Sequence, residues 1–394
     1  TSGLGVVLDE AGDLLAERLG LTERTAPVTD AFVEPDAAVA EAVDDDGTMA
    51  LDDLVAPRPE TLRRFLAGFE ADEAPTLHAL HLLNPHTPYR HLPDGRTYEA
   101  DPALRLITPE DDPDGGDRRA PAEPPAAVDR HRLQLEVAHT DRLVGDVLDR
   151  LRETDLYDDA LVVVTSDHGI GFRPGGAVRG LGDVQIRAAD QPELLWVPLF
   201  VKAPGQTAGQ VSDLPASTID VLPTIAAHLD IDLPWAVDGL DLTGPVPADR
   251  ERTFRHVVST VFGGVDVAPP VALDAAFADV ADLGTDSVFA DDGWWMVGPD
   301  PSAVGDRSSA AALPAELDDP AAFVDVDLDQ TEVPVVLSGR VAADVDRVAV
   351  VVNGRVAAVG DTYDDGGPGR FLVLVPPELL VDGPNEVRVT RAPR

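Results

Sequence analysis

Residues 161–170 have the sequence LVVVTSDHGI, and this stretch decides how the fold is interpreted. Four apolar residues, most of them β-branched, predict a buried β-strand, because such side chains fit a packed, pleated surface. Two hydroxyl residues, Asp167, His168 and a glycine follow at once. A polar turn after the strand would explain an isolated Asp-His pair, so the surrounding sequence must show whether the pair has a chemical role.

The elements around this strand predict an α/β crossover unit. Residues 127–153 place apolar residues at helical spacing with charged residues opposite, which predicts a long amphipathic helix before the strand. After it, WVPLFVKAPG (196–205) predicts a second strand, and STIDVLPTIAAHLDI (217–231) predicts a helix that begins at a Ser/Thr cap. Strands that alternate with helices indicate an α/β fold with a doubly wound, mostly parallel sheet.

A further strand is expected upstream, at PTLHALHLL (75–83), followed by NPHTPY with His86. Functional groups in such folds gather outside the carboxyl ends of the strands, so His86, Asp167 and His168 are expected to converge. His78 and His81 lie within the predicted strand and are expected to be core or interface histidines. Lys202, the only lysine, fits a structural ion pair at least as well as an active-site role.

The pattern of apolar and polar residues changes after about residue 325. Apolar and polar residues alternate with no helical pattern between them, and Asn353-Gly354 predicts a two-residue hairpin. We therefore expect an α/β domain over 1–325 and a small antiparallel β-sandwich over 326–394. The sandwich would act as a spacer or surface-docking module, or would seal an exposed edge of the large sheet.

The composition excludes several classes of protein. With 72 acidic and 30 basic residues the net charge is −42, which excludes a nucleic-acid partner held through phosphate contacts. The acidic runs are spread along the chain, which indicates a solvated acidic surface of the kind that halophilic proteins use. Calcium loops are the alternative, but the regular Asp spacing with a closing Glu is missing. There is no cysteine, and no apolar run approaches the length of about eighteen residues that spans a bilayer.

Asp167 and His168 together can enter the coordination shell of one metal ion. A carboxylate oxygen and an imidazole nitrogen suit Zn, Mn or a related divalent ion. Two ligands do not complete a site, because a catalytic metal needs at least one more protein group and an open position for substrate.

Four segments together carry a resemblance to a known family. They are LHLLNPHTPY, the helix with Asp141 and Gly145 that leads into LVVVTSDHGIGFRPG, VPLFVKAPGQ, and STIDVLPTIAAHLDIDLPWAVDG. Over roughly residues 75–240 their order and spacing resemble the sulfatase-like branch of the alkaline phosphatase superfamily. The C-terminal hairpin with Asn353-Gly354-Arg355 is similar to that of membrane-anchored sulfatase-like proteins.

The resemblance implies nucleophilic displacement on a sulfate or phosphate ester, assisted by a divalent metal ion (Ca, Mn, Mg or Zn). Asp167 and His168 would be metal ligands, and His86 would contact the transferring oxyanion. A basic residue in the loop after the Asp-His pair commonly binds the same oxyanion. Arg173 is the first candidate for this residue, and Arg179 is the second. The substrate would be a sulfate or phosphate ester, such as that of a cell-surface glycan or lipid.

The sequence departs from the family pattern in its first part. The acidic end of the first strand and the nucleophile, a Cys, Ser or Thr, are not found, and residues 1–70 resemble the portion that follows them. We expect the chain to be the C-terminal part of an extracytoplasmic enzyme anchored to the membrane through a region before Thr1. The alternative is a non-catalytic cell-surface binding or scaffold protein that retains the fold.

Overall fold

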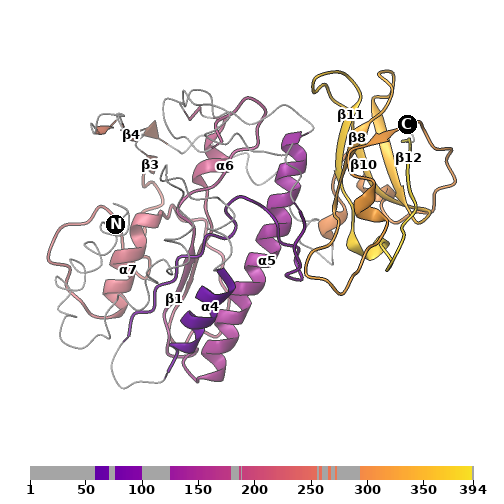
Figure 1. The fold of residues 1–394 in the computed structure, drawn as a ribbon. Coiled ribbons are helices and arrows are strands. Elements are labelled where there is room, and N and C mark those ends of the chain that lie inside the picture. The colour runs from indigo at the N-terminus through magenta and orange to yellow at the C-terminus, as the bar shows by residue number, and fades with distance from the viewer. Residues whose placement is uncertain are drawn as a thin grey trace, which may run out of the picture. The chain divides into compact units, whose positions relative to one another are not determined.

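The computed structural model describes residues 58–70, 76–99, 125–178, 186–187, 189–254, 257–259, 265–267, 271–272 and 293–392 (Figure 1). The chain divides into two compact units. The first takes its described residues from Thr1–Pro88, Leu143–Asp167 and Pro198–Arg252. The second takes its described residues from Tyr89–Arg142, His168–Val197 and Thr253–Arg394.

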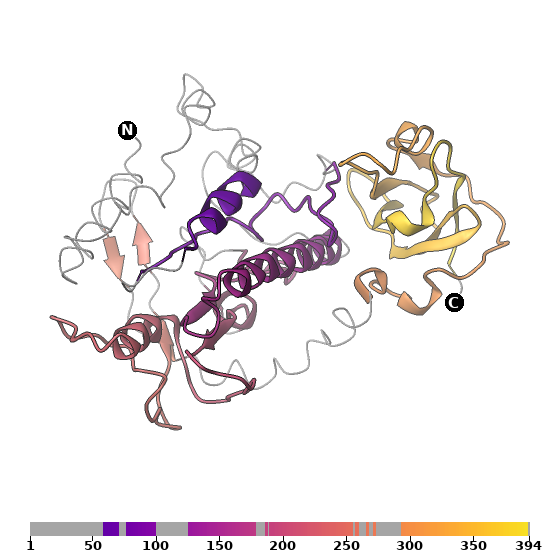
Figure 2. The same ribbon diagram turned by 90° about the horizontal axis from the view of Figure 1, so that it is seen from below.

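Helix α5, Pro125–Glu153, is the longest element of the described chain and confirms the helix that apolar spacing predicts. Its C-terminal part lies beside α4, Arg58–Ala67, as Figure 2 shows. Arg150 of α5 donates from Nε to the carbonyl of Leu66 at 3.1 Å. Helix α4 is therefore held to α5 where its own last carbonyls lack partners within the helix.

The strand after α5 is β1, Val162–Thr165, and it confirms the strand expected in LVVVTSDHGI. It pairs with β2, Leu199–Lys202, in antiparallel orientation. No two strands within the described ranges pair in parallel, so the mostly parallel, doubly wound sheet stays a prediction. Along the chain, the short helix α6, Gln191–Leu195, comes between β1 and β2.

Helix α7, Val221–His228, follows a short 3₁₀ turn and confirms the helix expected in STIDVLPTIAAHLDI. Asp220 joins the two, and its carboxylate accepts the backbone N–H of Ser217 and both terminal nitrogens of Arg250. The buried carboxylate thus connects Ser217, which precedes the 3₁₀ turn, with the later Arg250 segment.

The strand expected at 75–83 is wrong for residues 76–83, which form no strand in the structure. Leu77 is 58% exposed, and the ring of His78 packs edge-on against Phe65 and Phe69. Within the described residues this run pairs with no strand, and it contacts α4 and Phe69 just after it through His78 instead. His78 is thus an interface histidine, and its partial burial lowers its pKa.

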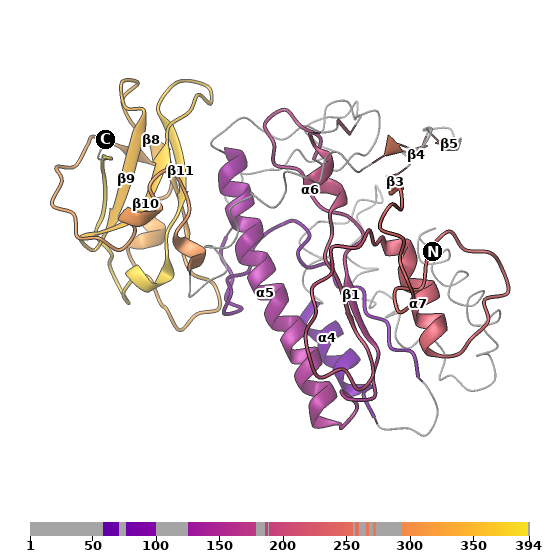
Figure 3. The same ribbon diagram turned by 180° about the vertical axis from the view of Figure 1, so that it is seen from behind.

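Two three-stranded antiparallel sheets form the C-terminal part, with strand orders β10-β9-β12 and β11-β8-β7 (Figure 3). The strands are β7 Glu316–Leu317, β8 Val336–Arg340, β9 Arg347–Val352, β10 Arg355–Asp361, β11 Arg370–Leu374 and β12 Val387–Arg391. Residues of both sheets share one apolar core, which includes Val350 of β9 and Phe371 of β11. Asn353 and Gly354 have positive φ and join β9 to β10 directly, which confirms the predicted hairpin.

The sandwich also shares a core with the N-terminal half of α5 inside the second unit. Val333, Val335 and Leu374 pack with Leu92, Tyr98 and Leu135. The backbone N–H of Val333 donates to the carbonyl of Thr97 at 2.9 Å. The expected domain boundary at 325/326 stays a prediction, although β7 precedes it in the chain and pairs with β8.

The remaining short elements lie directly before α7, between α7 and the sandwich, or within the loops of the sandwich. The paired strands are β3 Thr253–Phe254 with β6 Val271–Ala272, and β4 Val257–Ser259 with β5 Val265–Val267. The 3₁₀ turns are η3 Thr218–Asp220, η6 Gly293–Trp295, η7 Pro301–Ala303, η8 Ala321–Phe323 and η9 Pro377–Leu379.

Candidate active site

Asp167 and His168 lie two and three residues beyond the end of β1, where the sequence places them. Asp167 is exposed, and the Oγ of Ser166 lies 3.4 Å from its Oδ1. The Oγ1 of Thr165 donates to the carbonyl of Pro198 at 2.9 Å, which ties the end of β1 to the residue just before β2. The carboxylate therefore lies just beyond a strand end that is hydrogen-bonded to the neighbouring chain segment.

The ring of His168 has a defined tautomer. Its Nδ1 lies 2.6 Å from the carbonyl oxygen of Gly169, and a carbonyl can only accept, so Nδ1 carries the proton. In the neutral ring the lone pair is then on Nε2, as in metal-bound histidines whose other nitrogen donates to a backbone carbonyl. In this tautomer Nε2 is the ring atom with the chemistry of a metal ligand.

The loop behind the pair passes so close to other backbone that glycine is required. A Cβ on Gly169 would lie 2.0 Å from the carbonyl oxygen of Glu193, and one on Gly171 would lie 2.1 Å from that of Ala177. The backbone N–H of Gly169 donates to the carbonyl of Leu194 at 2.8 Å. Helix α6 thus packs directly on the backbone that follows His168.

Arg173 is exposed, while its backbone N–H donates to Oε2 of Glu193 at 3.2 Å. The same oxygen accepts the N–H of Phe172 at 2.8 Å, and the other carboxylate oxygen accepts from Arg130 at 2.9 Å. An exposed cationic side chain thus extends from a hydrogen-bonded backbone. Arg179, the second candidate, lies outside the described residues.

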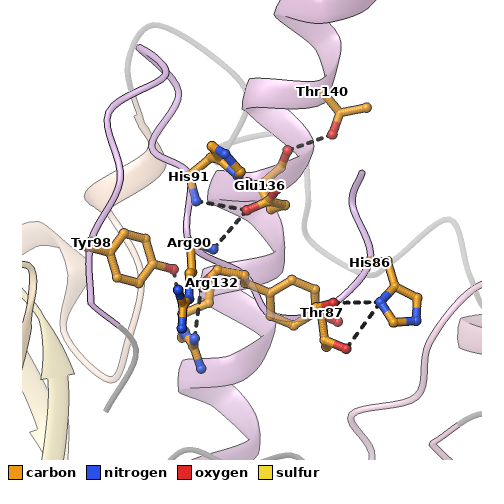
Figure 4. A network of polar contacts seen from close by, with 9 residues as sticks. His86, Thr87, Arg90, His91, Tyr98, Arg132, Glu136 and Thr140 are labelled. Atoms are coloured by element: carbon orange, nitrogen blue, oxygen red, sulfur yellow. Dashed lines mark hydrogen bonds and ion pairs between the residues drawn. The ribbon is translucent and has the colours of Figure 1, made fainter. Parts of the chain in front are cut away.

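His86 is half-buried, and its Nδ1 donates to the carbonyl of Thr87 at 2.6 Å (Figure 4). Its backbone N–H donates to the carbonyl of Leu83 at 2.5 Å, so a tight turn presents the ring. The neutral ring carries its lone pair on Nε2. The convergence of His86 with Asp167 and His168 stays a prediction.

Glu136 was missed by sequence reasoning, and it holds the segment that follows NPHTPY. Its buried carboxylate accepts the backbone N–H groups of Arg90 and His91, at 3.0 and 2.9 Å, and Nδ1–H of His91 at 2.8 Å (Figure 4). Burial by itself raises the pKa of Glu136, but its hydrogen bonds and the charge of His91 bring that pKa below its ordinary value.

A buried cation lies one turn earlier on α5. Arg132 donates to Asp129 Oδ1 at 3.0 Å and to the carbonyl of Tyr89 at 2.9 Å, and it lies 3.4 Å from the Tyr98 hydroxyl. Burial raises the pKa of Tyr98 to about 12 despite the opposing charge of Arg132. Residues 129, 132 and 136 are spaced by three and four, so they share one helix face, and this charged face of α5 is buried.

Lys202 contacts carbonyl groups and a ring. Its Nζ donates to the carbonyls of Tyr157 and Ala160, the latter at 3.1 Å, and lies 4.4 Å from the centroid of the Tyr157 ring. These contacts are structural. They differ from the expected ion pair, because the partners are carbonyl groups and an aromatic ring. His81, the second histidine of the expected strand, is exposed.

Asp167 and His168 offer two groups of the kind that bind divalent ions. An anionic oxygen of Asp167 and Nε2 of His168 are donors that suit a divalent ion. Within the described ranges, no group of three or more His, Cys, Asp and Glu side chains is placed to hold a metal ion. The pair therefore fits a metal as two of its ligands and requires others to complete the shell.

Three comparisons relate this region to known proteins. Residues 51–231 match the family model described as Sulfatase. The low-salt glycan biosynthesis sulfotransferase Agl7 of Haloferax volcanii is 30% identical over 47% of this chain and 40% of its own length. The ulvan-active sulfatase of Formosa agariphila is 27% identical over 50% of this chain and 38% of its own length.

A phosphonate monoester hydrolase from Silicibacter pomeroyi is a solved structure with a TM-score of 0.38 and 26% identity, over 57% of this chain and 50% of that one. The chain thus spans two fifths or less of the two curated relatives just described. Among the helices that the structure describes, none combines the length and the apolar character needed to cross a bilayer.

Proposed function

We propose that this chain, whose residues 51–231 match the family model described as Sulfatase, forms part of a metal-dependent sulfatase-like hydrolase or transferase that acts on sulfate or phosphate esters. The observation that carries the proposal is the Asp167-His168 pair at the end of β1, with the ring of His168 held so that Nε2 bears the lone pair. The pair lies within the family match, and its donor atoms suit a divalent ion.

Asp167 and His168 would hold one divalent ion (Ca, Mn, Mg or Zn), together with ligands outside this pair. When bound, such an ion neutralises charge that builds up on the transferring group. The carboxylate of Asp167 contributes charge to the site, and the Gly169 carbonyl keeps the His168 ring in the tautomer that binds.

His86 and Arg173 would bind the oxygens of the transferring group. Nδ1–H of His86 already donates to the Thr87 carbonyl, so the ring can donate to an oxyanion only through Nε2. This requires a proton on both nitrogens, which is the imidazolium form. Arg173 carries a permanent positive charge whose guanidinium matches the geometry of a tetrahedral oxyanion. Two cations near the developing charge supply most of what such a transfer requires.

We further propose that the ester group is carried by a glycan and that the protein works outside the cytoplasm in high salt. The glycan is supported by the name of the Haloferax relative, which describes a glycan biosynthesis sulfotransferase. High salt is supported by the net charge of −42, because such a surface repels itself unless ions screen it. A lipid ester is the alternative substrate. We also propose that the whole protein has a membrane anchor and a doubly wound, mostly parallel sheet.

The proposal is tested by titrating the purified chain with MnCl₂ and with CaCl₂ in a calorimeter, in molar KCl. We expect measurable binding that becomes about tenfold weaker or is lost in Asp167→Asn and in His168→Gln, because each removes a ligand. Asp159→Asn changes charge by the same amount at an exposed position and should bind as the parent does. Equal affinity in all four proteins would assign binding elsewhere, and no binding in any would favour the non-catalytic scaffold.

A further inference from the structure

We propose that Glu193 is a positioning residue that sets the place of Arg173, and thus the affinity of the site for the transferring oxyanion; this rests on the function proposed above. Glu193 lies on α6, twenty residues after Arg173, and no motif of the family resemblance includes it. The inference concerns only residues of the second unit.

The carboxylate of Glu193 uses both oxygens on different parts of the fold. Oε2 accepts two successive backbone N–H groups, from Phe172 at 2.8 Å and from Arg173 at 3.2 Å. Oε1 accepts from Nη2 of Arg130 on α5 at 2.9 Å. Hydrogen bonds to an ionised carboxylate are about twice as strong as neutral ones, so Glu193 stabilises the loop backbone more than a neutral acceptor would.

The loop is closed on both sides of these two amides. Gly171 N–H donates to the Val178 carbonyl at 2.9 Å, and Gly176 N–H donates to the Arg173 carbonyl at 2.7 Å. Phe172 is buried, and the Arg130 guanidinium lies 5.8 Å from the centroid of its ring. The backbone on either side of the Arg173 side chain is therefore fixed, although that side chain itself is exposed.

An exposed arginine alone pays a large entropy cost when it binds an anion, because its long side chain has many rotamers. Fixing its backbone removes the part of that cost that belongs to the main chain. It also keeps Arg173 at a defined place in the loop that follows His168, five residues upstream. Glu193 acts through Arg173 and does not itself touch substrate, because an anion beside an oxyanion would repel it.

The decisive experiment is a double-mutant cycle on the binding of inorganic sulfate and inorganic phosphate to the purified chain, measured by calorimetry. Arg173→Ala and Glu193→Gln should each weaken binding about tenfold, which corresponds to about 1.4 kcal/mol. In the double variant the second change should add little, because Glu193 works through Arg173. Glu153→Gln, the same chemical change at an exposed position of α5, should leave binding unchanged.

A second measurement tests the hydrogen bonds from the Phe172 and Arg173 amides to Glu193 directly. Amide hydrogen exchange at Phe172 and Arg173 should be faster in Glu193→Gln, while the Gly171 amide, which donates to Val178, should keep its protection. A general loss of structure would instead accelerate all three amides. This readout does not require any ligand.

The outcomes separate the two proposals. If Arg173→Ala weakens anion binding but Glu193→Gln does not, or if the two effects simply add, the positioning role is overturned while the proposed function stands. If the parent chain binds neither anion, or Arg173→Ala has no effect, the assignment of Arg173 in the proposed function fails and the positioning role fails with it. Coupled losses together with faster exchange at residues 172 and 173 support both.

Discussion

Glu136 accepts two hydrogen bonds from His91, one from its backbone N–H at 2.9 Å and one from its ring Nδ1 at 2.8 Å. A single buried carboxylate thereby fixes both the main chain and the side-chain rotamer of a residue 45 positions earlier. Arg90 donates its backbone N–H to the same carboxylate, so one side chain of α5 holds two successive residues of the segment after NPHTPY.

Replacing Glu136 by Gln should lower the free energy of unfolding by about 2 kcal/mol, because an amide cannot accept from every donor that faces the carboxylate. The pKa of Glu136 is below its ordinary value of 4.5, so its contribution is present above pH 4.5 and is lost as the pH falls through the lower folded value. Denaturant unfolding from pH 7 to pH 3 should show the gap between parent and variant closing in acid. A gap that is constant with pH would contradict the assignment.

His131 should make the fold sensitive to mild acid. Burial lowers its pKa from 6.5 to about 4, while its hydrogen bond to the Trp294 carbonyl opposes this. The unfolded chain takes up the proton first, so stability falls as the pH drops from 6.5 towards 4, by about 3 kcal/mol at most. His131→Gln should have a flatter profile of melting temperature over that interval. An unchanged slope would show that other groups cause it.

The Asp129–Arg132 pair should be costly to break on one side only. Arg132→Met leaves a buried carboxylate without its cation and should cost about 3–5 kcal/mol. Adding Asp129→Asn should recover a large part of this loss, because it removes the uncompensated charge. Asp149→Asn breaks a pair of the same spacing on the exposed side of α5 and should change stability little. Equal costs for both pairs in urea titrations would argue against the buried network.

Gly169→Ala and Gly145→Ala should have opposite effects. The new methyl group at 169 would lie 2.0 Å from the Glu193 carbonyl oxygen and should destabilise the protein by about 2 kcal/mol. At 145, within α5, nothing lies within 4 Å, so alanine should stabilise the helix by about 0.5–1 kcal/mol. Melting temperatures of the two variants provide the comparison. A stable Gly169→Ala protein would show that the loop can move away from α6.

Deleting residues 326–394 should produce a protein that aggregates, because it exposes Leu92, Tyr98 and Leu135. Val335→Ala is a milder form of the same test and should cost about 2 kcal/mol, whereas Val324→Ala, at an exposed position, should cost little. A truncated protein that stays soluble and melts cooperatively would instead support an autonomous C-terminal module.

The spacing and type of neighbouring residues correctly predicted two elements and one hairpin. The spacing of apolar residues was enough for α5, β-branched residues were enough for β1, and Asn353-Gly354 was enough for the hairpin. These features are encoded within a few residues of where they occur. The apolar run at 76–83 failed because a strand also needs a partner, which the local sequence does not specify.

The candidate site was predicted by type of residue and only partly by arrangement. The Asp-His pair follows a strand as expected, but Glu136, Asp129 and Glu193 were missed. A charged residue on a helix is ordinarily solvent-facing, and only the tertiary structure shows that backbone N–H groups approach it. The antiparallel pairing of β1 and β2 was likewise invisible, since strand direction depends on the route of the connecting chain.

The core that joins Leu92 and Leu135 to Val333, Val335 and Leu374 has a consequence for biosynthesis. Its two halves are separated by about two hundred residues, so the first half leaves the ribosome long before its partner strands exist. At ~5–20 residues per second, α5 would carry an uncovered apolar face for roughly ten seconds or more. Contacts of such long sequence separation also slow folding itself. The nascent chain should therefore depend on chaperones until its last strands emerge, and a ribosome that stalls before residue 333 would release a product prone to aggregation.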